Sequence, residues 1–125
     1  MILVDTSVWI DHLRKTDAQL ATALGQGRVV THPFVVGEVA CGSLHNRPLI
    51  LELMRDLPTA VVAENDEVLG FMERHRLHGR GIGYVDVHLL AAVALTPGSV
   101  LWTRDRRLHA AAQELDLVHP DVGLH

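Results

Sequence analysis

Residues 1–10, Met-Ile-Leu-Val-Asp-Thr-Ser-Val-Trp-Ile, decide how the rest of the sequence is interpreted. The first four residues are apolar without a break, which is typical of a strand covered on both faces in a parallel sheet. Asp5 ends the apolar run, and Ser7 can cap the helix that follows it. The segment therefore predicts a buried first strand that passes directly into a helix, with an acidic side chain at the junction.

The same kind of apolar stretch recurs four times along the chain, at residues 28–31, 59–63, 99–103 and 117–119. Longer segments with helix-start signals separate these stretches. The signals are Asp17, Pro33, Asn46 with Pro48, Asn65 or Asp66, Val85 and the region near Asp105. Alternating strands and helices indicate an α/β fold with a parallel sheet between two layers of helices.

The bulk properties suit one small domain. A chain of 125 residues, 48% of them apolar, can bury an adequate core, so we expect residues 1–125 to form a single domain. No apolar run approaches the roughly 20 residues that cross a bilayer. The apolar start has no basic flank of the kind that signal peptides carry, and the single Cys41 cannot form an internal disulfide. We therefore expect a cytoplasmic protein with no membrane partner.

The net charge of −4 is a weak argument against a nucleic-acid partner, because charge distribution matters more than the sum. Six arginines lie in the second half of the chain: Arg74, Arg76, Arg80, Arg104, Arg106 and Arg107. A bound divalent cation would also offset part of the carboxylate charge. The last three arginines could hold RNA phosphates, although a solvated helix start explains them equally well.

Four acids fall at positions that the predicted topology brings together: Asp5, Glu38, Asp86 and Asp105. In an open parallel sheet the carboxyl ends of the strands share one edge, and ligands bind where the strand order reverses. With the usual doubly wound order, the first and fourth strands flank that point, so Asp5 and Asp105 become neighbours. Glu38 interrupts an otherwise apolar helix, which predicts a partly buried carboxylate.

Converging carboxylates need a counter-charge. Two of them about 4 Å apart repel by roughly 4 kcal/mol at an effective dielectric constant near 20. Oxygen-only ligands suit Mg²⁺ or Mn²⁺, and such a cation can activate water for phosphodiester hydrolysis. Three hydroxyl side chains could orient the carboxylates by hydrogen bonding, as residues around a metal site do. They are Thr6, Ser7 and Thr103.

Other interpretations of these residues remain open. Asp5 and Asp105 could be ordinary helix N-caps, and Asp86 could be favoured by the helix dipole alone. His75 and His78 have the spacing of metal ligands, but no third ligand is evident. A phosphoacceptor receiver would need a late lysine, whereas the only lysine is Lys15, and a catalytically silent binding module on the same fold is a further alternative.

The motifs together resemble the PIN-domain ribonucleases, specifically the VapC-type toxins of bacterial toxin–antitoxin pairs. The matching segments are residues 2–10, Glu38 with Val39, residues 86–92 and residues 101–108. The resemblance implies a PIN-like three-layer α/β/α fold with a central, mostly parallel five-stranded sheet.

The same resemblance implies a function, which is a Mg²⁺- or Mn²⁺-dependent endoribonuclease that hydrolyses RNA phosphodiester bonds, in single-stranded or loop RNA. Its catalytic and metal-binding residues would be Asp5 and Asp86, completed by Glu38 and Asp105. It also implies a homodimer and a cognate antitoxin protein whose tail covers the active site.

Overall fold

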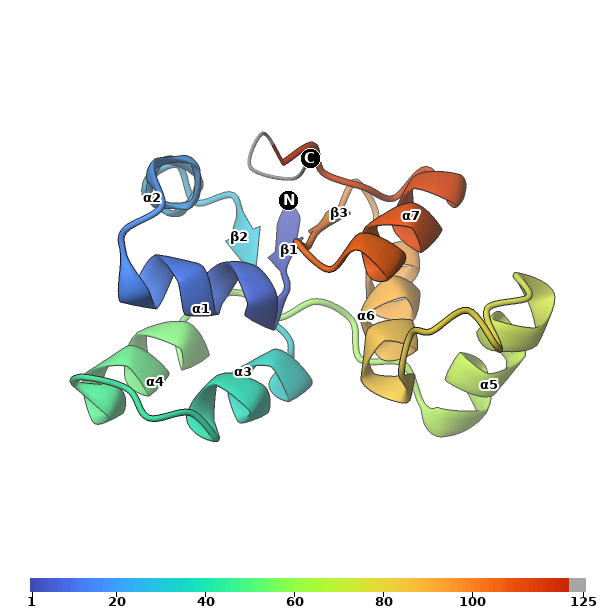
Figure 1. The fold of residues 1–125 in the computed structure, drawn as a ribbon, viewed down its shortest axis with the longest axis horizontal. Coiled ribbons are helices and arrows are strands. Elements are labelled where there is room, and N and C mark those ends of the chain that lie inside the picture. The colour runs from blue at the N-terminus through green and yellow to red at the C-terminus, as the bar shows by residue number, and fades with distance from the viewer. Residues whose placement is uncertain (122–125) are drawn as a thin grey trace.

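The computed structural model describes residues 1–121, in which helices separate each strand from the next along the chain (Figure 1). In order they are β1 (Ile2–Val4), α1 (Thr6–Arg14), α2 (Ala18–Gly25), β2 (Val29–Val30), α3 (Pro33–Ala40), α4 (Arg47–Arg55), α5 (Asn65–Arg74), α6 (Tyr84–Leu95), β3 (Val100–Trp102) and α7 (Arg106–Glu114).

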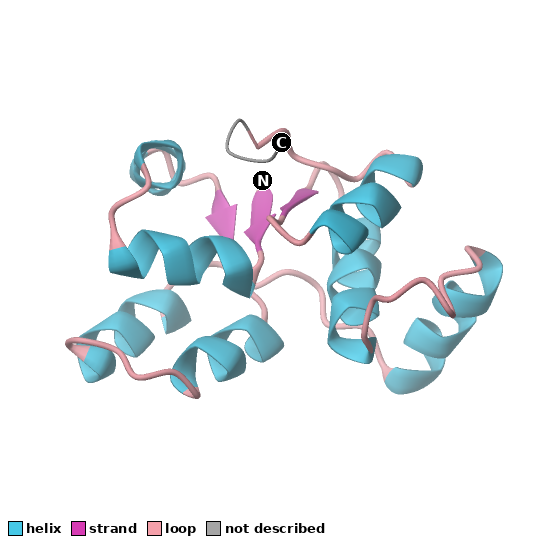
Figure 2. Cartoon of the chain, in the orientation of Figure 1, coloured by secondary structure: helices cyan, strands magenta, loops and turns pink. Residues whose placement is uncertain are grey.

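The sheet is parallel throughout, with strand order β2-β1-β3. Ile2 of β1 lies opposite Val29 on one side and Val100 on the other. Figure 2 shows the strands in the middle of the molecule, with α1, α3 and α4 to one side and α5, α6 and α7 to the other. The predicted α/β/α layering and the adjacency of the first and fourth predicted strands are therefore confirmed.

Two of the five predicted strands are shortened to single parallel bridges. Thr59 pairs with Thr31 next to β2, and Val118 pairs with Leu101 next to β3. The two bridges add one short segment at each edge of the sheet. The five predicted segments then follow one another in the usual doubly wound order. The first of these segments leaves the sheet early because the N–H of Val61 donates to Thr96 Oγ1 and not to a strand.

The buried core explains why β1 and α6 are apolar on all sides. All three residues of β1 are buried between two neighbouring strands and two helical layers. In α6, every residue from 87 to 93 is buried, which is what a helix without a polar face requires. This core fixes the ends of β1, β3 and α6, from which three of the four predicted acidic residues project.

Two helix starts and one helix end differ from the predictions. α1 begins at Thr6 with Asp5 in the N-cap position, so Ser7 lies inside the helix and does not cap it. α6 begins one residue earlier than expected, at Tyr84. α5 ends at Arg74, before the glycine-containing stretch that follows. Within residues 1–121, no helix combines the length and the apolar character needed to cross a lipid bilayer.

Candidate active site

Asp5 lies at the carboxyl end of β1, where the chain turns into α1. Its backbone N–H donates to the carbonyl of Trp102 at 2.8 Å, which continues the β1–β3 pairing up to the acid itself. The side chain is only 6% exposed, and its Oδ2 accepts hydrogen bonds from Ser7 Oγ and Thr103 Oγ1, both at 2.7 Å. Two hydroxyl groups therefore fix the orientation of this carboxylate.

Glu38 reaches the same region from α3. Thr6 Oγ1 donates to Glu38 Oε1 at 2.9 Å, which links the first turn of α1 to α3. Glu38 is exposed, so the prediction of partial burial is wrong. The reason is that α3 turns Val35 and Val39, four residues apart, toward the core. Glu38 lies off that face, and the apolar sequence around it does not enclose it.

Asp86 lies in the first turn of α6 and is half-buried. Its Oδ2 accepts a hydrogen bond from the N–H of Gly83 at 3.1 Å. Burial is the largest cause of a raised pKa at Asp86, and the Gly83 hydrogen bond offsets part of that effect. The negative charges of Asp5, Asp105 and Glu38 raise the pKa of Asp86 further, each by less than burial does. Asp86 therefore lies close enough to the other three predicted acids to be affected by their charges.

Asp105 is the N-cap of α7, as the structural alternative foresaw. Its Oδ1 accepts from the N–H groups of Arg107 and Leu108, both at 3.0 Å, and its own N–H donates to Thr103 Oγ1 at 3.1 Å. Asp5 occupies the corresponding position before α1 but makes no side-chain capping bond. Helix capping therefore explains the position of Asp105. It does not explain the orientation of the Asp5 carboxylate, which Ser7 and Thr103 hold.

The four carboxylates share a pattern that suits a hydrated cation. Within residues 1–121, the hydrogen bonds to each of them reach a single oxygen: Oδ2 of Asp5, Oε1 of Glu38, Oδ2 of Asp86 and Oδ1 of Asp105. The second oxygen of each remains for a ligand. In this part of the chain no three His, Cys, Asp or Glu side chains already converge as a metal cage. Mg²⁺ commonly keeps several waters and needs only one or two carboxylates, so the donor set fits it.

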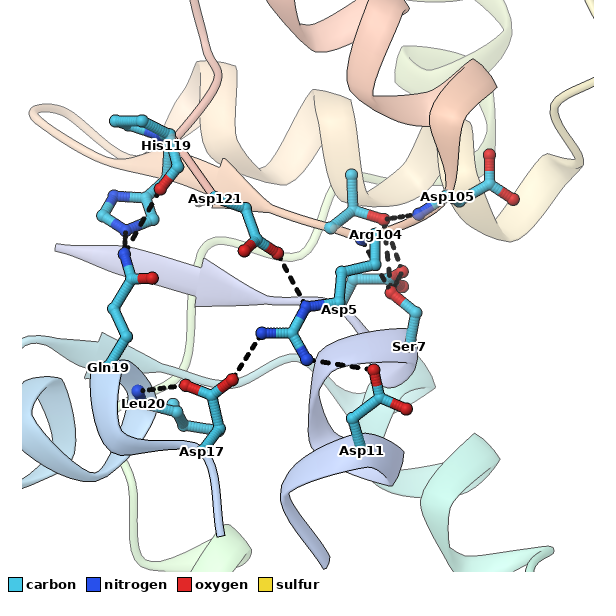
Figure 3. A network of polar contacts seen from close by, with 12 residues as sticks. Asp5, Ser7, Asp11, Asp17, Gln19, Leu20, Arg104, Asp105, His119 and Asp121 are labelled. Carbon is cyan, nitrogen blue, oxygen red and sulfur yellow. Dashed lines mark hydrogen bonds and ion pairs between the residues drawn. The ribbon is translucent and has the colours of Figure 1, made fainter. Parts of the chain in front are cut away.

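Arg104, which was predicted to contact RNA, is surrounded by carboxylates of the protein itself. Figure 3 shows its guanidinium among the carboxylates of Asp11, Asp17 and Asp121. The nitrogen–oxygen distances are 2.9 Å to Asp11, 2.5 Å to Asp17 and 2.7 Å to Asp121. All three guanidinium nitrogens are thus engaged by carboxylates, and the predicted RNA contact of Arg104 stays a prediction. None of the three acids was predicted to lie here, because each comes from a different segment and no spacing connects them. Asp17 was expected only to start a helix, which it also does through its bond to the N–H of Leu20.

Arg106 and Arg107 are exposed at the start of α7, beside Asp105. The Arg107 side chain lies against Gly81, so closely that a Cβ on Gly81 would be 2.3 Å from Nη1. Gly81 belongs to the loop that leads to Gly83 and Asp86, and Arg107 therefore flanks the acidic site. The histidine alternative gains no support, because His75 packs its ring on Phe71, 4.5 Å between centroids.

Two hollows lie beside the α1–α4 side of the molecule. The larger, about 470 Å³, has a mixed lining, with the apolar Ile10, Leu13, Leu44, Leu49 and Ile50 and the polar Arg14, Ser43, His45 and Asn46. The second, about 280 Å³, is lined by Trp9, Leu24 and Leu53 among others. Leu49 and Leu53 are more than half exposed, which leaves apolar surface uncovered next to both hollows.

Comparisons with known proteins agree with the geometry. The PIN domain family model matches residues 2–114. The chain is 52% identical over 114 residues to Ribonuclease VapC32 from two strains of Mycobacterium tuberculosis, CDC 1551 / Oshkosh and H37Rv, covering 91% of this chain and 92% of each relative. A solved structure described as FitAB bound to an IR36 DNA fragment has a TM-score of 0.62 at 20% identity, covering 97% and 98% of the two chains, and supports the fold alone. The family match and the identity together show that this chain belongs to the PIN-domain family, as a VapC-type member.

Proposed function

We propose that this chain is a Mg²⁺- or Mn²⁺-dependent endoribonuclease that hydrolyses RNA phosphodiester bonds as the toxin of a toxin–antitoxin pair. The observation that carries the proposal is the placement of four acids from separate parts of the sequence. Thr103 Oγ1 bonds both the Asp5 carboxylate and the N–H of Asp105, and Thr6, next to Asp5, donates to Glu38. Burial and the charges of these three carboxylates raise the pKa of Asp86, which agrees with that placement. Such repulsion is unfavourable in the protein alone and is relieved by a cation. The name Ribonuclease VapC32 of the relatives supports the same conclusion.

In this proposal Asp5 and Asp86 hold the cation, and Glu38 and Asp105 complete the pocket directly or through water. When bound, the cation lowers the pKa of a water molecule and shields the phosphate charge. Ser7 and Thr103 keep the Asp5 carboxylate in one orientation. No nucleophile from the protein is required.

The proposed substrate is single-stranded or loop RNA. Glu38 and Asp105 are exposed, so the acidic site is open to a polymer chain. Arg106 and Arg107 would contact phosphates on the α7 side, which would offset the negative charge of the site. Proteins commonly recognise the unpaired bases of such RNA by shape and stacking.

We further propose that the chain acts as one domain, forms a homodimer and binds a cognate antitoxin protein. The two hollows beside α1 and α4, together with Leu49 and Leu53, support a protein partner, because exposed apolar patches commonly mark interaction surfaces.

The test of the proposed activity compares wild type with Asp5→Asn and Asp86→Asn on total cellular RNA, with Mg²⁺ and with a chelator. Asp66→Asn is the matched control. Asp66 is exposed in the first turn of α5, beside Ala94 and Leu95 at the opposite end of α6 from Asp86. We expect cleavage by wild type and Asp66→Asn in Mg²⁺ only, and none by the other two. Cleavage by Asp5→Asn and Asp86→Asn at the wild-type rate would rule the site out.

A second experiment identifies the RNA. Brief expression of the wild type, followed by sequencing of RNA fragment ends, should reveal new ends at a small set of sites that Asp86→Asn does not produce. New ends spread evenly over all transcripts would contradict recognition of particular loops.

A further inference from the structure

The Arg104 guanidinium joins three segments that are distant in the sequence to the end of β3. Nε pairs with Asp121 at 2.7 Å, Nη1 with Asp11 of α1 at 2.9 Å, and Nη2 with Asp17, the N-cap of α2, at 2.5 Å (Figure 3). The side chain of Arg104 is 19% exposed and that of Asp121 is fully buried. Every nitrogen of the guanidinium is thus engaged, and only an arginine presents donors in such a planar fork.

This surrounding makes Arg104 unsuitable for holding RNA. Among residues 1–121, three carboxylates pair with this one guanidinium, so its hydrogen-bond donors already face negative charge and compete poorly for phosphate. Freeing the guanidinium would take a positive charge away from the buried Asp121 carboxylate, which is unfavourable. Burial alone would lower the pKa of Arg104, but the hydrogen bonds with Asp17, Asp121 and Asp11 outweigh it and raise that pKa.

Arg104 is also connected to Asp5 through its backbone. The N–H of Arg104 donates to Ser7 Oγ at 3.0 Å, and Ser7 Oγ donates to Asp5 Oδ2 at 2.7 Å. Ser7 and Asp11 are four residues apart on α1, so they lie on the same face of that helix. Arg104 therefore holds α1 at two points one turn apart, by its main chain at Ser7 and by its side chain at Asp11.

The consequence concerns the two hydroxyl groups that orient Asp5. One donor, Ser7, lies on α1, and the other, Thr103, lies beside Arg104 at the end of β3. Ser7 reaches Asp5 within the start of α1, and Thr103 reaches it across the β1–β3 pair, so the two bonds meet on one oxygen while α1 keeps its position relative to β3. Asp17 and Asp121 hold the guanidinium in place from the other sides, so they stabilise the same arrangement.

We propose that Arg104 is a positioning residue for Asp5, and that it acts by holding α1 against the end of β3 and not by contacting RNA. This inference rests on the proposed function, because the activity that it tunes is the cleavage of RNA at the Asp5 site.

The principal test is Arg104→Lys. Lysine keeps the charge and binds phosphate well as a point charge, but it cannot pair with three carboxylates in one plane. We expect kcat to fall about tenfold or more, as for residues that orient metal ligands, with KM for RNA unchanged. The salt dependence of RNA binding, measured in the Asp86→Asn background, should also stay unchanged. Arg55→Lys, at an exposed position at the end of α4, is the control and should match wild type.

A second variant, Asp17→Asn, tests the same idea from the partner side. Asparagine keeps the Oδ1 acceptor that caps α2 at Leu20, so the helix start is preserved. We expect kcat to fall in the same direction, and the double variant with Arg104→Lys to lose less than the two single losses combined. If Arg104 contacted RNA, release from Asp17 would tighten RNA binding, and that result would overturn the proposal.

Binding of Mn²⁺, followed by the paramagnetic resonance signal of the free ion, gives a readout that does not depend on cleavage. Arg104→Lys should bind Mn²⁺ several-fold more weakly than wild type at equal folded fraction, and Arg55→Lys should not. A wild type that binds Mn²⁺ but leaves RNA intact, with weaker binding in Arg104→Lys, would reject the proposed activity and retain the positioning role. Wild-type kcat and Mn²⁺ affinity in Arg104→Lys would overturn that role.

Discussion

Thr103 Oγ1 donates a 2.7 Å hydrogen bond to Asp5 Oδ2, although the two residues are 98 positions apart in the sequence. The contact exists because β1 and β3 are parallel neighbours, with Val4 opposite Trp102, so that the residues following both strands meet at one edge. Thr103 is fully buried, and its hydroxyl also accepts from the N–H of Asp105. One hydroxyl group thus links two of the four acids.

Replacing Thr103 with valine should separate the effect of this hydroxyl from that of side-chain volume. Thr103→Val keeps the shape but removes the donor to Asp5 and the acceptor for the Asp105 N–H. We expect cleavage of RNA to slow by about tenfold to a hundredfold. The free energy of unfolding should fall by about 1–2 kcal/mol, because a buried polar group loses its partner.

Thr103→Ser is the control, since serine retains the hydroxyl and should cleave RNA at close to the wild-type rate. Rates from initial cleavage and unfolding free energies from urea titration provide the comparison. Equal activity of the valine and serine variants would mean that the hydroxyl does not orient Asp5 for the reaction.

Asp86→Asn should stabilise the metal-free protein while abolishing its activity. Because burial and then the neighbouring carboxylates raise the pKa of Asp86, ionising this group opposes folding. The contribution of the protonated Asp86 side chain to the free energy of unfolding is greatest at low pH. It is lost as the pH rises through the pKa that Asp86 has in the folded protein. At neutral pH in a chelator, the variant should therefore have a higher Tm than wild type.

Adding Mg²⁺ should reverse that order. A cation that binds only the folded state raises Tm by mass action, and it should do so for wild type far more than for Asp86→Asn. Differential scanning fluorimetry with chelator and with Mg²⁺ measures both effects. A wild-type Tm that does not respond to Mg²⁺ would count against Asp86 as a metal ligand.

The contact between Arg107 and Gly81 provides a matched pair of glycine variants. Gly79 and Gly81 both have positive φ, +71° and +78°, but only Gly81 lies against the arginine. Alanine at either position should cost about 1 kcal/mol of stability, because L-residues with a side chain disfavour that region. Only Gly81→Ala should push the flexible Arg107 side chain aside.

If Arg107 contacts RNA phosphates, RNA affinity should fall in Gly81→Ala and stay unchanged in Gly79→Ala. The affinities are best measured in the Asp86→Asn background, so that the RNA is not consumed, and at two salt concentrations. Identical affinities in the two alanine variants would indicate that the position of Arg107 is irrelevant to binding.

Much of this architecture could be predicted because it depends on local patterns. The apolar run before Asp5 required a buried strand, and the general rule for open parallel sheets then placed the residue after β1 beside those after β3. Pro33 in the first turn of α3 and Asp17 before α2 were predicted from equally local signals, and both are present. These helix starts were predicted correctly because a single residue type decides the local conformation.

Long-range features could not be predicted in the same way. The segments around Thr59 and Val118 are rich enough in apolar residues for strands, but their length depends on the partner that each edge offers. The exposure of Glu38 depends on which face α3 turns to the core, and an apolar helix does not specify that. The partners of Arg104 come from three separate segments, so no spacing in the sequence connects them.

His32 should make the stability of the protein depend on pH. It is fully buried at the N-cap of α3, where Nδ1 accepts a hydrogen bond from the N–H of Phe34 at 3.1 Å. Burial, and then the nearby His88, lower the pKa of His32 from 6.5 to about 4. Between those values the unfolded chain binds the proton and the folded chain does not, so stability falls as the pH drops below about 6.5.

The loss should reach about 2 kcal/mol near pH 5, and burial of His88, which lowers its pKa too, acts with the same sign. His32→Asn keeps an acceptor for the Phe34 N–H but cannot titrate, so its stability should change less over this range. Urea unfolding at about pH 7.5 and about pH 5 measures the difference. A wild-type protein no more sensitive to acid than His32→Asn would mean that His32 binds its proton as readily in the folded chain as in the unfolded one.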